Sequence, residues 1–184
     1  ARAEAALVAL LEDPNDDVRR EAMDACARRA LASAWPVFSA LMVEGNAEIR
    51  ASAARGLGRA NDVAYVPILV RALGDAEAVV RAAALHALGS YADPSARGPV
   101  EARLGDDDAR VRSAAAEALG RIGSPLATSS LLARIADDAP EVRLAVVEAL
   151  GLLRDPSAAP ALELALDDAH DPVRTAAALA IARI

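Results

Sequence analysis

The feature that most constrains the fold of this chain is a Val-Arg or Ile-Arg pair that returns every 31 residues. The six pairs are Val18-Arg19, Ile49-Arg50, Val80-Arg81, Val111-Arg112, Val142-Arg143 and Val173-Arg174. A fixed period in this range is typical of repeat proteins, in which one supersecondary unit is copied along the chain. We therefore expect six copies of one unit instead of a single globular core.

Both halves of each unit carry apolar residues at helical spacing. In the second half, apolar residues stand one before, three after and seven after the repeat Arg, which is one face of a helix. In the first half, an apolar i, i+4 pair indicates a shorter helix of about 10 residues that needs tertiary packing to be stable. A glycine recurs inside the second helix, at Gly58, Gly89, Gly120 and Gly151. Because glycine costs about 1 kcal/mol relative to alanine in a helix, we expect close backbone approach there.

A capping residue followed by proline separates the later copies. The three examples are Asp93-Pro94, Ser124-Pro125 and Asp155-Pro156. A side-chain cap before a proline at the first helical position predicts the start of a first helix. The first copy lacks this capping residue and proline, and it has Ala27 at the position of the recurring glycine. We therefore expect a reshaped junction, or an extended helix, between the first two copies.

The composition agrees with a helical stack that has thin layers. The chain is 54% hydrophobic and only 2% aromatic, and all 20 of its basic residues are Arg. It contains no run of 18 uninterrupted apolar residues and opens with no secretory signal, so we expect a cytoplasmic protein. The single cysteine, Cys26, lies on the apolar stripe of the first copy and is interpreted as a core residue without a chemical role.

The repeated blocks resemble a known family. Segments such as Asp106 to Arg112, and Ala83 to Gly89 followed by Asp93-Pro94, resemble HEAT-like repeats of the short bacterial type that also occurs in phycobilin lyase subunits. The resemblance implies an all-α fold, a right-handed α-solenoid of six two-helix repeats. It also implies use as a scaffold or as a peptide-binding or protein-binding surface, since the motif specifies the fold and says little about function.

The repeats predict one domain over residues 1–184. Its approximate repeats are 1–31, 32–62, 63–93, 94–124, 125–155 and 156–184. The chain opens without Met and stops at Ile184, where another turn of the Gly-Asp-Pro type would follow. We therefore expect it to be a fragment of a longer protein.

An acidic residue stands six positions before every repeat Arg. The pairs are Asp13 and Arg19, Glu44 and Arg50, Asp75 and Arg81, Asp106 and Arg112, Asp137 and Arg143, and Asp168 and Arg174. The family resemblance implies that these positions form a structural ladder that ties adjacent repeats together. The repeat Arg is therefore interpreted as framework and not as a ligand-binding residue.

Metal-binding and catalytic patterns are sparse in this sequence. No Asp-x-Asp-x-Asp-Gly series for calcium is present, and the acidic turns are interpreted as helix caps. The only histidines are His86 and His170, and the chain has no His-Glu dipeptide, Gly-rich phosphate loop or Gly-x-Ser-x-Gly elbow. The sequence predicts a protein that is not an enzyme and that has no metal or cofactor.

The candidate partner-binding residues lie on the exposed face of the second helices, which the resemblance places on the concave side. Offsets +1, +5 and +9 from the repeat Arg share this face. Its site residues are Arg20, Arg28, Arg55, Arg59, His86, Glu117, Arg121, Leu144, Glu148 and Leu152. The groove is therefore expected to run from basic in the early copies to acidic and apolar in the late ones. Leu152 and the other late apolar residues are alternatively interpreted as a surface that a further repeat would cover.

Three functions fit this sequence. The favoured one is a protein-protein interaction scaffold that grips a segment of another protein in the concave groove. The first alternative, implied by the resemblance, is a subunit of a lyase or isomerase that acts on a protein-bound tetrapyrrole. The second is nucleic-acid binding through the early Arg cluster, which a net charge of −7 disfavours. The partner and the oligomeric state are left open.

Overall fold

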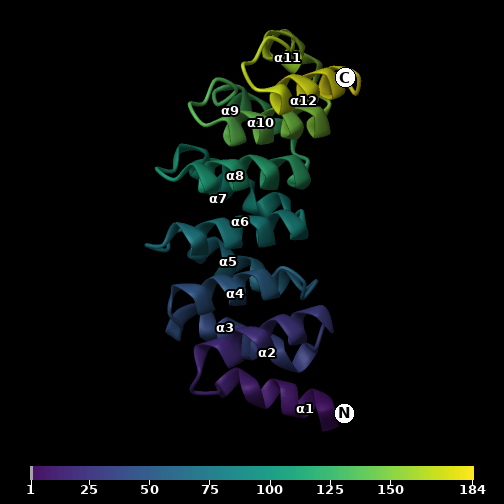
Figure 1. Ribbon diagram of the computed structural model, residues 1–184. Coiled ribbons are helices and arrows are strands. Elements are labelled where there is room, and N and C mark those ends of the chain that lie inside the picture. The colour runs from purple at the N-terminus through teal and green to yellow at the C-terminus, as the bar shows by residue number, and fades with distance from the viewer. Residues whose placement is uncertain (1) are drawn as a thin grey trace. The chain divides into compact units, whose positions relative to one another are not determined.

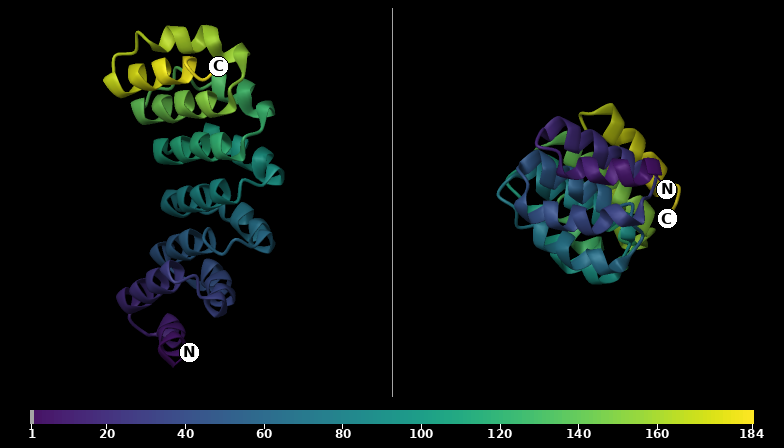
Figure 2. Two further views of the ribbon diagram at one scale, coloured as in Figure 1. Left: turned by 90° about the vertical axis from the view of Figure 1, so that its right-hand side faces the viewer. Right: turned by 90° about the horizontal axis from the view of Figure 1, so that it is seen from below.

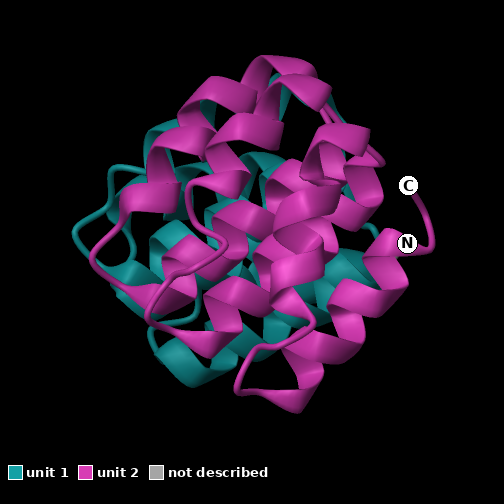
Figure 3. Ribbon diagram, turned by 90° about the horizontal axis from the view of Figure 1, so that it is seen from above, with its two compact units in different colours: residues 1–91 teal, residues 92–184 magenta. Residues whose placement is uncertain are grey.

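The computed structural model describes residues 2–184, and no strand occurs among them. Contacts divide the chain into two compact units, residues 1–91 and 92–184 (Figure 3). Each unit contains three two-helix repeats, in which the first helices form one layer and the second helices another (Figure 2). The prediction of an all-α solenoid of HEAT-like repeats is confirmed.

The first unit contains three pairs of helices (Figure 1). Its first helices are α1 (Arg2–Ala9), α3 (Trp35–Glu44) and α5 (Val66–Ala72). Its second helices are α2 (Asp16–Arg28), α4 (Ala47–Leu57) and α6 (Ala78–Tyr91). Helix α4 packs against both α2 and α6, so the second helices form a continuous layer in this unit.

The second unit repeats this arrangement. Its first helices are α7 (Arg97–Glu101), α9 (Thr128–Leu132) and α11 (Ala159–Ala165). Its second helices are α8 (Ala109–Ile122), α10 (Pro140–Leu153) and α12 (Asp171–Ile181). Helix α10 packs against α8 on one side and α12 on the other. The first helices are short because each one follows a separate 3₁₀ turn, such as Pro94–Ala96.

The apolar stripes form the core of both units. The residue before the repeat Arg is fully buried in copies two to five, and so is the Leu seven residues after it. Phe38, Leu69, Val100, Leu131 and Leu162 bury the first helices at equivalent positions. Cys26 lies in the same core, and burial raises the pKa of its thiol. Leu7 and Val18 of the first copy are only half-buried.

The recurring glycines lie where two second helices approach closely. A Cβ atom built on Gly120 would lie 2.9 Å from the Cα of Ala149, and one built on Gly151 would lie 2.8 Å from the Cβ of Ala180. Gly58 makes the same approach to Ala87, at 2.9 Å from its Cα. The helix spacing therefore depends on glycine, as the sequence predicts.

The turns between repeats share a left-handed residue that the sequence analysis missed. Positive φ angles recur at 31-residue intervals, at Ala30, Asn61, Ala92, Gly123 and Arg154. Gly123 and Asn61 adopt this conformation readily, but the repeat geometry also imposes it on Ala30, Ala92 and Arg154, whose side chains disfavour it. The expectation of an extended helix after the first copy is wrong. Helix α2 ends at Arg28, and Ala30 turns the chain as its equivalents do.

The caps before proline start a 3₁₀ turn and not the α-helix itself. The Oδ1 atom of Asp93 accepts a hydrogen bond from Ser95 N at 2.8 Å, and Asp155 caps Ser157 N in the same way at 2.9 Å. Ser124 makes no side-chain cap. The first α-helix begins only after the turn, at Arg97 in the case of Asp93.

Replacing Gly120 with Ala tests the close approach. The added methyl would meet the backbone of α10, so we expect the free energy of unfolding to fall by about 1–3 kcal/mol despite the better helix propensity of alanine. Urea denaturation followed by circular dichroism would measure it. Gly74→Ala is the control, because the nearest atom to its Cβ is 3.5 Å away. A Gly120→Ala variant as stable as the control would contradict this explanation.

Candidate functional site

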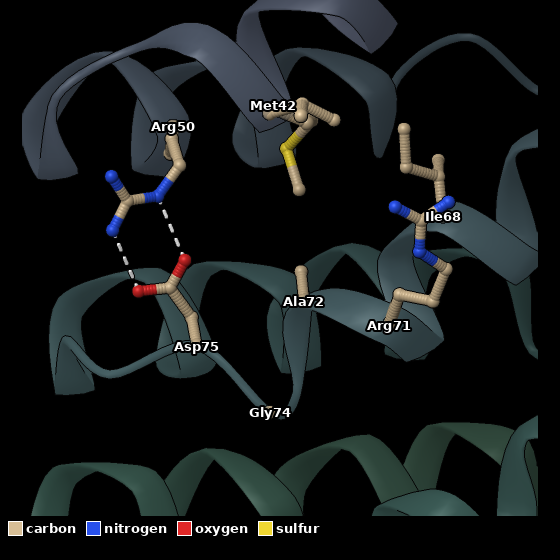
Figure 4. A pocket seen from close by; sticks show the side chains of 8 residues that line it. Met42, Arg50, Ile68, Arg71, Ala72, Gly74 and Asp75 are labelled. Carbon is tan, nitrogen blue, oxygen red and sulfur yellow. Dashed lines mark hydrogen bonds and ion pairs between the residues drawn. The ribbon is translucent and has the colours of Figure 1, made fainter.

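Within each unit, a repeat Arg joins one repeat to the next. The Nε and Nη2 atoms of Arg50 each donate a hydrogen bond of 2.7 Å to the two carboxylate oxygens of Asp75, which lies in the following repeat (Figure 4). Its Nη1 donates to the carbonyl oxygen of Gly45 in its own repeat, at 2.9 Å. One guanidinium group therefore fixes its own interhelical turn and the next one.

The second unit contains the same arrangement twice. Arg112 donates to both carboxylate oxygens of Asp137, at 2.8 and 2.9 Å, and Arg143 donates to those of Asp168, at 2.7 and 3.1 Å. The side chain of Asp137 is only 3% exposed. The paired carboxylate is thus largely removed from water, and it needs this bidentate partner.

The acidic residue of each of these pairs also holds its own turn. Oδ1 of Asp168 accepts a hydrogen bond from His170 N at 2.9 Å, and its carbonyl oxygen accepts one from Arg174 Nη1 at 2.7 Å. Hydrogen bonds from Arg143 lower the pKa of Asp168 to about 2. The pKa of Asp75 is lowered for the same reason, by Arg50. Both carboxylates therefore stay ionised at neutral pH.

The first and last copies depart from the ladder that the resemblance implies. Arg19 pairs with Asp16 in its own helix, and Glu44 of the following copy is exposed. Asp16 also accepts a hydrogen bond from Asn46 Nδ2, so a different carboxylate links these two copies. Arg174 pairs with Asp171, three residues before it. In both copies the Arg side chain pairs with a carboxylate of its own helix.

A pocket of about 250 Å³ lies between α2 and α4, on the face where the sequence analysis places the partner. Arg20 lines it from α2, Arg55 from α4, and Arg59 from the turn that follows α4. Its floor includes the buried side chains of Met23 and Ala27. This α2–α4 pocket therefore combines a small apolar floor with three guanidinium groups at its rim.

Two carboxylates, those of Glu21 and Asp24, also line the α2–α4 pocket. Asp24 lies 3.8 Å from Arg59 and also pairs with Arg28, which lies outside the pocket. Arg20 pairs with Asp17. Arg55 donates to the hydroxyl of Ser52 at 2.9 Å, and within residues 2–184 it forms no ion pair. Its charge is therefore available to an anionic group from outside.

The remaining predicted groove residues lie on other helices. His86 is exposed on α6, in the same unit as the α2–α4 pocket but not in its lining. In the second unit, Arg121 approaches Glu117 at 3.6 Å on α8, while Glu148 and Leu152 are exposed on α10. Leu144 is half-buried and therefore less accessible than expected. None of these residues lines the α2–α4 pocket.

Two polar residues of the α2–α4 pocket lie outside the groove predicted from the sequence. Glu21 and Ser52 both stand two positions after the repeat Arg, an offset that was not counted as part of the groove. Ser52 lies three residues before Arg55, so helical spacing places it on the same face. Adding offset +2 to the groove would have found both residues.

No metal site or membrane span is found in the part of the chain that the structure describes. No group of three or more His, Cys, Asp or Glu residues in 2–184 is placed to hold a metal ion. No helix over the same residues is long and apolar enough to cross a membrane. Among the described residues, the α2–α4 pocket therefore offers a ligand charged side chains and a small apolar floor, and no group of metal-binding residues.

Two-helix units that are stacked and joined by Arg-Asp pairs define an α-solenoid repeat protein. The chain belongs to the family of HEAT repeats, which matches residues 3–89, 69–143 and 131–182. No curated protein matches the sequence.

Solved structures of known proteins share this fold. A chain of the complex of CpcE and CpcF of phycocyanin lyase from Nostoc sp. PCC7120 is 22% identical, with a TM-score of 0.75 over 95% of this chain and 74% of that one. A designed armadillo repeat protein in complex with the peptide (KR)4 is 19% identical, with a TM-score of 0.73 over 96% and 97%. The YibA protein of E. coli is 22% identical, with a TM-score of 0.78 over 97% and 71%. At these identities the likeness shows the fold alone.

The Arg-Asp pairs are tested by comparing Arg112→Ala with Arg174→Ala. Removing Arg112 leaves the carboxylate of Asp137 without its bidentate partner, so we expect the free energy of unfolding to fall by about 2–4 kcal/mol. Arg174 pairs with an exposed carboxylate, and its loss should cost about 1 kcal/mol or less. Urea denaturation followed by circular dichroism would compare the two. Equal losses would show that the Arg-Asp pairs between repeats contribute no more to the free energy of unfolding than a pair within one repeat.

The lowered pKa of Asp168 predicts how its contribution depends on pH. Because its folded pKa of about 2 lies below the ordinary value of 3.8, the pair stabilises the fold fully above about pH 4, and this stabilisation is lost as the pH falls through 2. We expect the stability difference between the wild type and Asp168→Asn to shrink over this range. Urea denaturation at several pH values would measure it. A difference that stays constant with pH would contradict the assignment.

Proposed function

We propose that this chain is a non-catalytic interaction scaffold that binds a segment of another protein on the face of its second helices, with the α2–α4 pocket as its anchor point. The observation that carries the proposal is the convergence of Arg20, Arg55 and Arg59 on one pocket. The framework positions are filled by the Arg-Asp pairs and the core, whereas these exposed positions differ from copy to copy. Variation on a constant frame is how repeat proteins build binding surfaces.

The charges of the α2–α4 pocket favour a carboxylate as the group that is bound. Three guanidinium groups face two carboxylates, Glu21 and Asp24, so the lining carries one net positive charge. A single Glu or Asp side chain of the partner matches this charge, and the planar guanidinium of Arg55 suits a carboxylate. Successive phosphates of a nucleic acid would be repelled by Glu21 and Asp24. We therefore favour an acidic protein segment over a nucleic acid.

The comparisons agree with a protein partner. The similar designed armadillo repeat protein binds a peptide, and the similar lyase chain is part of a complex of two proteins. Both use the fold that this chain has. The chemistry of the partner is inferred from the α2–α4 pocket instead, since fold does not determine function.

The double variant Arg55→Glu/Arg59→Glu tests this function. A fluorescein-labelled peptide of alternating Glu and Ser serves as the probe, with binding measured by fluorescence anisotropy at low and moderate salt. We expect wild-type binding that weakens with salt and at least a ~10-fold loss in the variant. The melting temperature should stay unchanged because both side chains are exposed.

The matched control is Arg110→Glu/Arg154→Glu, which makes the same change of charge on exposed residues of the second unit that lie outside the predicted groove. This variant should bind the acidic peptide as the wild type does. Equal losses in both double variants would reduce the effect to overall charge and overturn the assignment to the α2–α4 pocket. Stronger binding of single-stranded DNA than of the peptide would favour the nucleic-acid alternative.

A further inference from the structure

Two pockets lie at equivalent positions in the layer of first helices, one in each unit. The α3–α5 pocket, of about 360 Å³, contains the pair Arg50 and Asp75 on one side and Ile68 and Arg71 on the other (Figure 4). The α9–α11 pocket, of about 450 Å³, contains the pair Arg143 and Asp168. Each residue of the second pair lies three repeat lengths after its equivalent in the first. The repeat geometry therefore builds both pockets in the same way.

The two pockets differ in the side chains at their outer side. Arg71 lines the α3–α5 pocket, and Leu164 of α11 takes its place in the α9–α11 pocket. Ala161 replaces Ile68 and leaves more room. Ile135 lines the α9–α11 pocket at the position where Met42 lines the α3–α5 pocket, so both pockets are apolar there. The same cavity is thus basic at its rim in the first unit and apolar in the second.

Leu164 is an exception to the pattern of the repeats. Its side chain is 79% exposed, and the same position is exposed in every other copy. The other copies have Ala9, Ala40, Arg71, Ala102 and Ala133 there. A bulky apolar residue placed at a solvent-facing position beside a cavity contributes nothing to the core. Single exposed apolar residues are common on protein surfaces, but Leu164 also lines a cavity together with Ile135 and Ala161, in which an apolar side chain of a partner fits.

The surroundings of Leu164 are acidic. Glu163 precedes it, and Asp167 follows in the turn that ends α11; both are exposed. The second unit as a whole contains 15 Asp or Glu residues against 10 Arg. An apolar residue flanked by carboxylates is complementary to an apolar side chain flanked by Lys or Arg.

We propose that the α9–α11 pocket is a second interaction surface that binds a basic amphipathic helix of another protein. An apolar side chain of that helix enters the pocket against Leu164 and Ile135, while its Lys or Arg residues face Glu163 and Asp167. Anchors of this kind are typical of a helix bound in a groove. This surface is independent of the α2–α4 pocket, because it lies in the other helix layer and selects the opposite charge.

The variant Leu164→Arg tests the proposal, because it gives the α9–α11 pocket the residue found in the α3–α5 pocket. The probe is a fluorescein-labelled amphipathic helical peptide of Leu and Lys, measured by fluorescence anisotropy. We expect the variant to bind at least ~10-fold more weakly, which is the effect of losing the burial of one leucine. Leu126→Arg is the matched control, since Leu126 is also in the second unit, is 71% exposed and lies outside the pocket. The control should bind as the wild type does.

Two further peptides test each part of the recognition. A peptide with its Leu residues replaced by Ser and one with its Lys residues replaced by Glu should both fail to bind. Equal weakening by Leu164→Arg and Leu126→Arg would mean attraction by overall charge alone and would overturn the proposal. Self-association of the protein that Leu164→Arg abolishes, in sedimentation without peptide, would assign the surface to a second copy and would overturn it as well.

Discussion

The bidentate hydrogen bond between an Arg of one repeat and an Asp of the next is the interaction on which both units depend. Two-helix units of this size cannot bury their apolar faces alone, so stability comes from the contact with each neighbour. Apolar packing holds the helices together, and the directional hydrogen bonds of the Arg side chain add a constraint on their relative position. The Arg side chain binds carboxylate oxygens in one repeat and a carbonyl oxygen in its own. The register of the stack is thereby fixed.

The same constraint explains why the glycines and the left-handed residues recur with the Arg. Once the register is fixed, Gly120 must face Ala149 closely, and a side chain there would push the helices apart. The turn that leads to the next repeat must likewise reverse within a few residues. Ala92 and Arg154 accept a positive φ for that reason. The strain of about 1–2 kcal/mol at each such residue is offset by the packing of the repeat that follows.

The sequence predicted the period, the two helices of each repeat, the buried stripes and the close approach of the glycines. These features follow from apolar spacing and helix propensity, which are local properties. The left-handed turns were missed because Ala30 and Ala92 have no residue preference that marks them. The replacement of Glu44 by Asp16 as the link between the first copies was missed because it depends on which carboxylate reaches Arg19 in space. The α2–α4 pocket was anticipated through its Arg residues, but without Glu21 and Ser52.

A fixed register also determines where function can vary. The Arg-Asp pairs and the core residues are constrained by packing, which leaves the exposed faces of the two helix layers free to change. Because the backbone brings equivalent cavities to each unit, a single substitution such as Arg71 to Leu164 between copies changes the chemistry of a cavity without changing its construction. Under the two proposals above, the chain obtains surfaces of opposite preference, one for an acidic and one for a basic apolar segment, from one repeated unit. In both proposals a few exposed residues on an otherwise uniform frame decide what is bound.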